Sequence, residues 1–550
     1  MNLVTIKYNA LISLIAALLF IPFLGNVHLF DWDEINFAEC AREMLVTDDY
    51  FSVTINYQPF WEKPPVFIWM QALSMKMFGV NEFAARFPNA ICGIITLNVL
   101  FNIGRKLVDK RFGILWTLIY AGSFLPHFYF KSGIIDPWFN LFIFLGIYYF
   151  ILFSHNRSEG NKNIVLSALF IGIAIMTKGP VALLVFGLCF TVFFVLNRFQ
   201  SIISFKQLFI YGLTLLSVGS LWFIMLALTG HSDIIIEFFV YQVRLFKTQD
   251  AGHGGPFFYH WIVLLVGCFP LSIIALGAFK KDNLDVPSQK HFKRWMLILF
   301  WVVLILFSIV KTKIVHYSSL CYFPLSYLAV YVAYKLINGE LRWKKLYTVL
   351  LMLIATVIGI AVAALPIIDK YKTPIIEANL IKDAFAIENL KATVSWTGFE
   401  WLIGLGFIIG TAIMLRFIHQ GKLKMGLVGV FLLSVVVINS ASVMITPKIE
   451  QYSQGAAIEF YESLQAEDCY VETIGFKSYA HLFYTAKRKP TNANSYDMNW
   501  LLAGEIDKPV YFVCKINLAN DIKNNHPFLK ELYRKNGFVF WKREVLVNNN

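Results

Sequence analysis

The sequence contains few charged residues for its length. Asp, Glu, Lys and Arg make up 15% of the 550 residues, hydrophobic residues make up 57%, and the mean hydropathy is +0.60. In soluble globular domains about a quarter of the residues are charged. The composition therefore excludes an ordinary soluble protein and predicts a polytopic membrane protein.

Cysteine is also scarce, and no CxxC or Cys/His spacing predicts a structural zinc site among the seven cysteines. Four cysteines lie in apolar stretches, where we expect small buried side chains: Cys92, Cys189, Cys268 and Cys321. Cys469 and Cys514 lie in a polar C-terminal tail and could form a disulfide if that tail is extracytoplasmic. The chain has no internal repeat.

The net charge of +13 does not by itself indicate nucleic-acid binding. The Lys and Arg residues sit in short loops between apolar runs, where they set membrane orientation. No basic face with interleaved exposed aromatic residues stands apart from those runs. We therefore expect no nucleic-acid partner.

Apolar runs of about 17 to 25 residues predict thirteen membrane spans. They lie at 8–29, 84–103, 112–130, 137–154, 163–177, 180–196, 207–228, 257–279, 295–310, 316–334, 346–368, 397–415 and 425–443. The first run is too long for a cleaved signal core and lacks a cleavage site before Asp31, so we expect it to remain as a span.

Basic residues orient these spans, because short cytoplasmic loops are rich in Lys and Arg. The basic loops near 105–111, 280–294, 335–345 and 416–424 all follow even-numbered spans. This pattern predicts a cytoplasmic N-terminus and places the residues after 443 outside the membrane on the opposite face.

The chain is therefore expected to have two domains. Residues 1–443 form the transmembrane domain, whose first outer loop, 30–83, carries two interfacial helices, one following Asp33 and one near 65–80. Residues 444–550 form a small extracytoplasmic α/β domain. We predict its helix near 456–466 and its strands near 468–475, 509–516 and 537–543.

Unusual polar residues collect on the predicted outer side. They are Asp33, Glu34, Glu62, Lys63, Lys131, Asp136, Lys178, Arg244, His253, Lys311, Lys313, His316 and Tyr317. Charges beside a membrane are costly and usually functional. Their grouping predicts one outward-facing cavity that holds both anion-binding side chains and carboxylates.

Such a mixture suits the transfer of a sugar from a polyprenyl phosphate. Cations stabilise the negative charge that grows on the phosphate, and one carboxylate can take the acceptor's proton or stabilise the anomeric carbon. We predict Asp33 as the first catalytic residue, followed by Asp136 and Glu62. The predicted phosphate- or substrate-binding residues are Lys63, Lys178, Arg244, Lys313, Tyr317 and Glu34.

Each of these residues also has a structural interpretation. Asp33 or Glu34 could cap a helix, Asp136 could cap the next span, and Glu62 with Lys63 could form an exposed ion pair in a turn. Lys178 could extend to the head groups, and Tyr317 could anchor the chain at the interface. His253 lies in a glycine-rich segment that we expect to be a mobile loop.

A divalent metal ion is possible, because Asp31, Asp33 and Glu62 offer oxygen ligands. A phosphate site already supplied with Lys and Arg does not require one. The sequence therefore does not predict a required cofactor.

Several motifs resemble those of the ArnT-like aminoarabinose transferases, a group of GT-C membrane glycosyltransferases related to the protein O-mannosyltransferases. They are the segment from Asp33 to Met44, the Glu62-Lys63-Pro64-Pro65 motif, the segment from Phe78 to Arg86, Asp136, Thr177-Lys178-Gly179-Pro180 and Lys311-Thr312-Lys313. They occur in the family's order and cover most of the membrane region.

The resemblance implies a catalytic Asp33, a second acidic residue at Asp136, and lipid-phosphate contacts from Lys63, Arg244 and Tyr317. It also implies thirteen spans, an undecaprenyl phosphate donor, and a bacterial inner membrane with the active face toward the periplasm. It does not fix the sugar or the acceptor, which could be lipid A, another glycan or a protein. Ile35-Asn36-Phe37 departs from the more polar residues of the aminoarabinose enzymes.

Three other functions compete with this one. Thirteen spans could form a transporter or lipid flippase, although such proteins tend to show paired halves that this chain lacks. A ligase of the same architecture would differ only in its donor. A noncatalytic subunit of an envelope assembly would tolerate replacement of Asp33.

Overall fold

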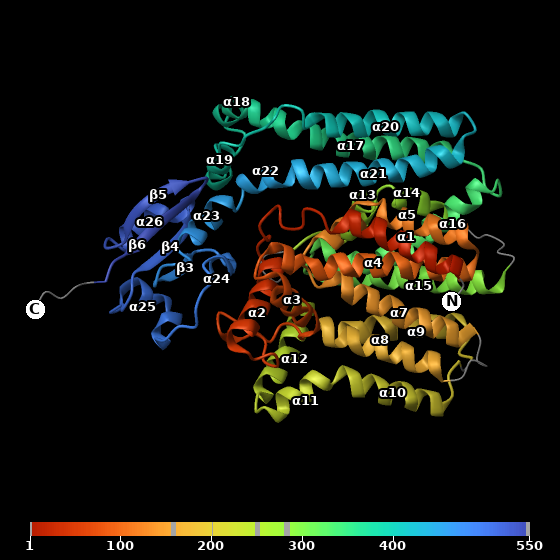
Figure 1. Cartoon of the computed structure of the whole chain (residues 1–550), viewed down its shortest axis with the longest axis horizontal. Helices are drawn as coiled ribbons and strands as arrows, with labels where there is room; N and C mark the ends of the chain where they lie inside the picture. Colours follow the sequence, from red (N-terminus) through yellow and green to blue (C-terminus); the bar gives the residue numbers. More distant parts are fainter. Residues whose placement is uncertain (1–2, 156–160, 201, 248–253, 280–285, 546–550) are drawn as a thin grey trace, which may run out of the picture.

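The computed structural model describes residues 3–155, 161–200, 202–247, 254–279 and 286–545. It is mostly helical, with long helices running side by side and a small sheet at one end of the bundle (Figure 1). Helices α2 (Asp33–Thr47), α3 (Val66–Phe78) and α12 (Ser232–Lys247) lie at this same end. His253 falls outside the described residues.

Eight segments are long and apolar enough to cross a membrane within the described part of the chain. They are α1 (Leu3–Phe20), α4 (Glu82–Leu107), α7 (Asp136–His155), α15 (Pro287–Ile309), η4 with α16 (Val315–Ile337), α17 (Lys345–Lys370), α20 (Trp401–His419) and α21 with α22 (Leu423–Gln451). Two bent pairs raise the number to ten: α10 (Phe205–Gly219) with α11 (Leu221–Leu228), and α13 (Tyr259–Gly267) with α14 and η3 (Leu271–Phe279).

The remaining predicted spans are occupied by shorter helices. They are α5 (Lys110–Ala121), α8 (Lys162–Lys178) and α9 (Val181–Leu196). Within the predicted span 112–130, α5 ends before Gly122, and two short helices follow, α6 (Phe124–Phe128) and η1 (Tyr129–Lys131). Gly179, at a φ of 98°, separates α8 from α9. By length and composition the structure supports eight to ten spans, so the predicted count of thirteen exceeds what it demonstrates.

The helices pack in layers. α17, α20 and α21 form one group, α7, α8 and α10 form another, and α4 packs against both α1 and α5 (Figure 1). Their apolar side chains form one large buried core. Helices that are apolar on nearly all faces are expected where lipid replaces water around the protein.

Both helices of the first outer loop are present, but α2 has no solvent-exposed polar face along most of its length. Every residue from Glu34 to Met44 is buried. Arg42 pairs inside the protein with Glu39, and Glu43 accepts hydrogen bonds from Thr54 and the Tyr57 amide. The exposed polar face expected for α2 is therefore not observed, because its charged side chains pair inside the protein.

The tail contains a four-stranded mixed sheet with the order β3-β4-β6-β5. Its strands are β3 (Tyr470–Ile474), β4 (Val510–Lys515), β5 (Lys530–Lys535) and β6 (Phe538–Arg543). Helices α22 (Thr446–Gln451), α23 (Gly455–Ser463), α24 (Ala480–Tyr484), α25 (Met498–Ala503) and α26 (Ala519–Asn525) accompany it, and α18 (Lys372–Glu377) and α19 (Ala384–Leu390) lie nearby.

The tail is joined to the first outer loop through a shared core of buried side chains from α2, α3 and α24. The Leu29 amide donates a hydrogen bond to the Tyr484 hydroxyl at 2.6 Å, and Arg42 donates one to the Lys487 carbonyl at 2.9 Å. Segments more than four hundred residues apart therefore form one packed unit.

A disulfide between Cys469 and Cys514 does not form. Cys514 in β4 lies opposite Ile474 in β3, and Ile474 is five residues beyond Cys469 in the sequence. Both cysteines are free. Along a strand each residue adds about 3.3 Å, so the two Cα atoms are far beyond the roughly 7 Å that a disulfide tolerates. The Cys514 sulfur instead accepts a hydrogen bond from Trp541.

Candidate functional site

A cavity of about 470 Å³ lies where the helix bundle meets the first outer loop and the tail. Its lining brings together most of the predicted site residues: Asp33, Glu62, Lys63, Asp136, Lys178, Arg244 and Tyr317. They come from the start of α2, the loop before α3, the start of α7, the end of α8, α12 and η4 (Val315–Cys321). Only Glu34 and Lys313 of the predicted set are absent from the lining.

Four charged or titratable side chains form a continuous chain in this cavity. Lys178 Nζ lies 2.7 Å from Asp136 Oδ1, and His316 Nε2 lies 3.2 Å from Asp33 Oδ2 and 3.9 Å from Asp136 Oδ2. Asp136 is 4% exposed, whereas Asp33 is 37% exposed. Asp33 is therefore the carboxylate that a ligand in the cavity can reach.

These contacts distinguish between the earlier interpretations. Trp32 is the residue that precedes α2, and no side chain caps that helix, so Asp33 does not act as its cap. Lys178 is paired with Asp136 and lies over the Tyr317 ring, 5.5 Å from the ring centroid, instead of extending to the head groups.

A second group surrounds Tyr241, which sequence reasoning missed. Its hydroxyl donates a hydrogen bond to Glu62 Oε2 at 3.0 Å. The Lys63 ammonium and the Arg244 guanidinium lie 5.1 and 5.2 Å from the centre of its ring. Because Tyr241 and Arg244 are three residues apart, they share one face of α12. The three-residue spacing from Arg244 was the sequence feature that could have identified Tyr241.

Lys63 is a desolvated cation. Its side chain is 13% exposed, and Glu62 lies 3.9 Å away. Burial lowers the pKa of Lys63, and the nearby charge of Glu62 only partly opposes this effect. A buried ammonium gains more from an anionic ligand than a hydrated one does. With Lys178 and Arg244, it forms a basic wall suited to a phosphate.

The tail contributes the other wall. Lys477 and Tyr479 line the cavity beside Trp32, and the Lys477 ammonium lies 5.2 Å from the centre of each of the two rings. The Tyr479 amide donates a hydrogen bond to Asp31 Oδ1 at 3.2 Å. No sequence motif predicted this contribution.

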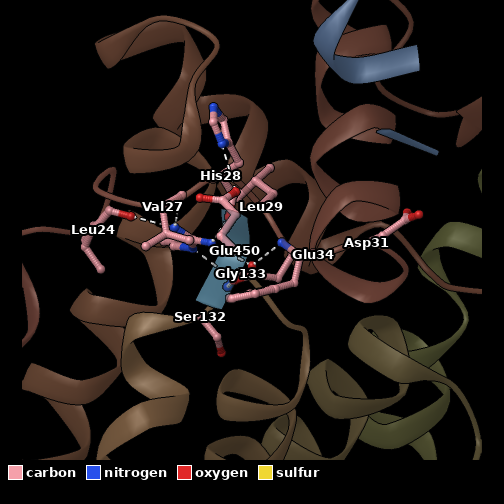
Figure 2. Close-up of polar contacts among 12 residues, drawn as sticks. Leu24, Val27, His28, Leu29, Asp31, Glu34, Ser132, Gly133 and Glu450 are labelled. Atoms are coloured by element: carbon pink, nitrogen blue, oxygen red, sulfur yellow. Dashed lines mark hydrogen bonds and ion pairs between the residues drawn. The ribbon is translucent and has the colours of Figure 1, made fainter. Parts of the chain in front are cut away.

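Glu34 is a structural residue, not a ligand for substrate. It is 4% exposed and forms two hydrogen bonds with Arg86, at 3.0 and 2.8 Å. Its carboxylate also accepts hydrogen bonds from the amides of Phe30 and Gly133 (Figure 2). Although burial opposes ionisation, the charge and hydrogen bonds of Arg86 lower the pKa of Glu34.

Arg86 extends this network to the loop before α2. Its guanidinium donates hydrogen bonds to the carbonyls of Leu24, Val27 and His28 at 2.7 to 2.9 Å. His28 in turn contacts Glu450 in α22 at 2.8 Å (Figure 2). One buried ion pair thus fixes the segment that leads into Asp33 and, through Gly133, the segment that leads into Asp136.

Lys313 is the second predicted ligand that the structure excludes from the cavity. It is 5% exposed, and its ammonium donates hydrogen bonds to the carbonyls of Phe307, Ser308 and Val310 at 2.9, 2.7 and 2.6 Å. These carbonyls lie at the end of α15, where the last turn has no intrahelical donors. Lys313 therefore caps this helix.

The carboxylates proposed for a metal ion do not converge. Asp31 accepts backbone hydrogen bonds, Asp33 contacts His316, and Glu62 contacts Tyr241. Over the described ranges, no group of three or more His, Cys, Asp or Glu side chains is arranged to hold a metal ion. The residues present do not fit the metal site suggested by the sequence.

The sequence has known relatives over part of its length. Residues 62–224 match the family model described as dolichyl-phosphate-mannose-protein mannosyltransferase. Two similar curated proteins are undecaprenyl phosphate-alpha-4-amino-4-deoxy-L-arabinose arabinosyl transferases. The one from Edwardsiella ictaluri is 28% identical over 56% of both chains, and the one from Enterobacter sp. is 28% identical over 58% of both. The similar region therefore spans little more than half of these relatives.

The fold is shared more widely than the sequence. ArnT from Cupriavidus metallidurans, solved bound to undecaprenyl phosphate, has a TM-score of 0.75 and 16% identity, with 98% of each chain covered. The archaeal oligosaccharyltransferase AglB from Archaeoglobus fulgidus has a TM-score of 0.51 and 12% identity, covering 94% of this chain and 70% of that one. The resemblance to ArnT-like GT-C glycosyltransferases is confirmed.

Proposed function

We propose that this protein is an integral-membrane glycosyltransferase that moves a sugar from an undecaprenyl phosphate donor to an envelope acceptor. The observation that carries the proposal is one cavity in which a basic wall of Lys63, Lys178 and Arg244 lies beside an accessible carboxylate, Asp33. The arabinosyl transferase relatives and the lipid-bound ArnT structure support the donor class.

The basic wall binds the lipid phosphate. Lys63 and Arg244 flank Tyr241, and Tyr317 lies against Lys178, so the phosphate meets these cations and the Tyr317 hydroxyl. Negative charge on the phosphate increases as the glycosidic bond breaks, and fixed cations stabilise that charge more in the transition state than in the ground state. Glu62 orients Tyr241 instead of reacting with the sugar.

Asp33 is the general base. The acceptor hydroxyl attacks the anomeric carbon, its proton passes to Asp33, and the bond from the anomeric carbon to the phosphate oxygen breaks. The polyprenyl phosphate leaves with the bonding electrons, and no acid is needed because phosphate is a good leaving group. Asp136, paired with Lys178, holds that cation in place beside the reacting atoms.

The membrane arrangement follows from the same proposal. Residues 1–443 form a transmembrane catalytic domain in which the two bent pairs and the three short helices also cross, giving thirteen spans. Residues 444–550 form an α/β domain on the side of the cavity. The N-terminus is cytoplasmic and the cavity and tail lie on the opposite face, as the basic loops predict. The resemblance to ArnT-like enzymes supports a bacterial inner membrane with this face toward the periplasm.

The acceptor and the sugar stay open. Lipid A, another envelope glycan and a protein hydroxyl can each supply the attacking oxygen. A ligase would use the same cavity with a preassembled glycan on its donor. The identity of the donor separates these reactions.

The test is sugar transfer in proteoliposomes with a panel of polyprenyl-phosphate sugars and envelope acceptors. Asp33→Asn should reduce kcat by at least about a hundredfold, the range in which general base catalysis contributes. Asp48→Asn is the matched control, because Asp48 is an exposed residue at the other end of α2. Equal transfer by wild type and Asp33→Asn would contradict the role of Asp33, and no transfer by a folded wild type across the panel would contradict the function.

A further inference from the structure

His316 lies in the cavity within 4 Å of two of the predicted catalytic carboxylates, Asp33 and Asp136. Its Nε2 atom lies 3.2 Å from Asp33 Oδ2 and 3.9 Å from Asp136 Oδ2, and its side chain is 12% exposed. It is the second residue of the 3₁₀ helix η4, next to Tyr317. His316 and the two carboxylates therefore belong to three different segments of the chain.

The two carboxylates are not equivalent partners. Asp136 Oδ1 already accepts a hydrogen bond from Lys178 at 2.7 Å, whereas Asp136 Oδ2 is buried and has no hydrogen-bond partner. An unsatisfied buried carboxylate oxygen is costly. A small movement of the imidazole from Asp33 toward Asp136 would satisfy it.

We propose that His316 is a positioning residue whose imidazole orients Asp33 for proton abstraction and shifts toward Asp136 when Asp33 becomes protonated. This proposal rests on the proposed function. During the reaction the imidazole, whose Nε2 lies 3.2 Å from Asp33 Oδ2 in the structure, donates its Nε2 proton to that oxygen and directs the other oxygen of Asp33 toward the acceptor hydroxyl. Once that oxygen has taken the acceptor's proton, the carboxyl is a weaker acceptor, and Asp136 Oδ2 becomes the better partner.

The proton count balances in this step. One proton moves from the acceptor hydroxyl to Asp33, while the Nε2 proton stays on His316 and only changes its acceptor. The bond between acceptor oxygen and anomeric carbon forms as the bond to phosphate breaks. Asp33 returns its proton to water after the product leaves, because its side chain is exposed to the cavity.

Two substitutions separate this role from a structural one. His316→Gln keeps an N–H donor on the side chain, whereas His316→Ala removes the donor. His231→Gln is the control, because His231 is a half-buried residue just before α12 that does not line the cavity. The donor is the polyprenyl-phosphate sugar that supports transfer by the wild type.

We expect His316→Ala to lower kcat at least tenfold with the KM for donor changed less than twofold. His316→Gln should retain most of kcat. Equal losses of kcat in both variants would overturn the proposal, as would full activity in His316→Ala. Failure of the proposed function is distinguishable, because the wild type itself would then transfer no sugar.

Discussion

The buried pair between Glu34 and Arg86 offers a direct test of how the site is held together. Arg86→Met removes the cation that pairs with the 4% exposed Glu34 carboxylate, together with three hydrogen bonds to loop carbonyls. Breaking a buried pair by removing one partner costs roughly 3–5 kcal/mol, because the remaining charge is left uncompensated. We expect a loss of this size in the free energy of unfolding.

The pH dependence should have a defined sign. The pKa of Glu34 is lowered in the folded protein, so its ionised form contributes stability above the unfolded pKa. That contribution is lost as pH falls through the folded pKa. Arg86→Met should therefore remove part of the acid sensitivity of wild type, in addition to lowering stability at neutral pH.

The assay is denaturant or thermal unfolding in detergent micelles. Glu34→Gln with Arg86→Met should be more stable than Arg86→Met alone, because no charge is then buried. Lys508→Met is the control, since Lys508 pairs with Asp468, which is 73% exposed, and such pairs contribute about 0–1 kcal/mol. If Arg86→Met is no more destabilising than Lys508→Met, the reasoning is refuted.

Three further predictions concern the cavity, a buried glutamate and the cysteines. Lys63→Met and Arg244→Met should each raise the KM for the lipid donor at least tenfold in the transfer assay, whereas Lys489→Met, an exposed change in the tail, should not. Burial and Glu39 raise the pKa of Glu43 to about 8, so the stability that its protonated form provides is fully present below 4.5 and is lost as pH rises through about 8. Glu43→Gln should flatten that part of the unfolding profile. Thiol labelling of folded protein should modify Cys469 before the buried Cys514, and a nonreducing gel that traps them as a disulfide would contradict the strand register.

Much of the site could be predicted because costly charges are easy to see in an apolar sequence. Asp33, Lys63, Asp136, Lys178 and Arg244 stood out against their neighbours, and they all line the cavity. Glu34 and Lys313 stood out equally, yet they satisfy backbone groups inside the protein. Sequence shows that a buried charge needs a partner but not whether that partner is a ligand or a carbonyl.

The elements that sequence reasoning missed carry weaker patterns. β5 contains mostly exposed polar residues, Lys-Glu-Leu-Tyr-Arg-Lys, so no apolar alternation marked it. Its turn to β6 at Asn536 and Gly537, both with positive φ, was the visible sign. Lys477 and Tyr479 could not be found at all, because their role depends on the tail folding back onto the loop at Asp31.

That return of the tail also bears on how the protein is made. Trp32 emerges early in synthesis, whereas Lys477 and Tyr479 emerge after the helices that carry the basic wall. The cavity is therefore complete only when the tail has folded against the first loop. The order of synthesis therefore delays completion of the cavity until the whole bundle has been made. A partly synthesised chain has the cations of the basic wall but lacks the tail residues that would exclude water.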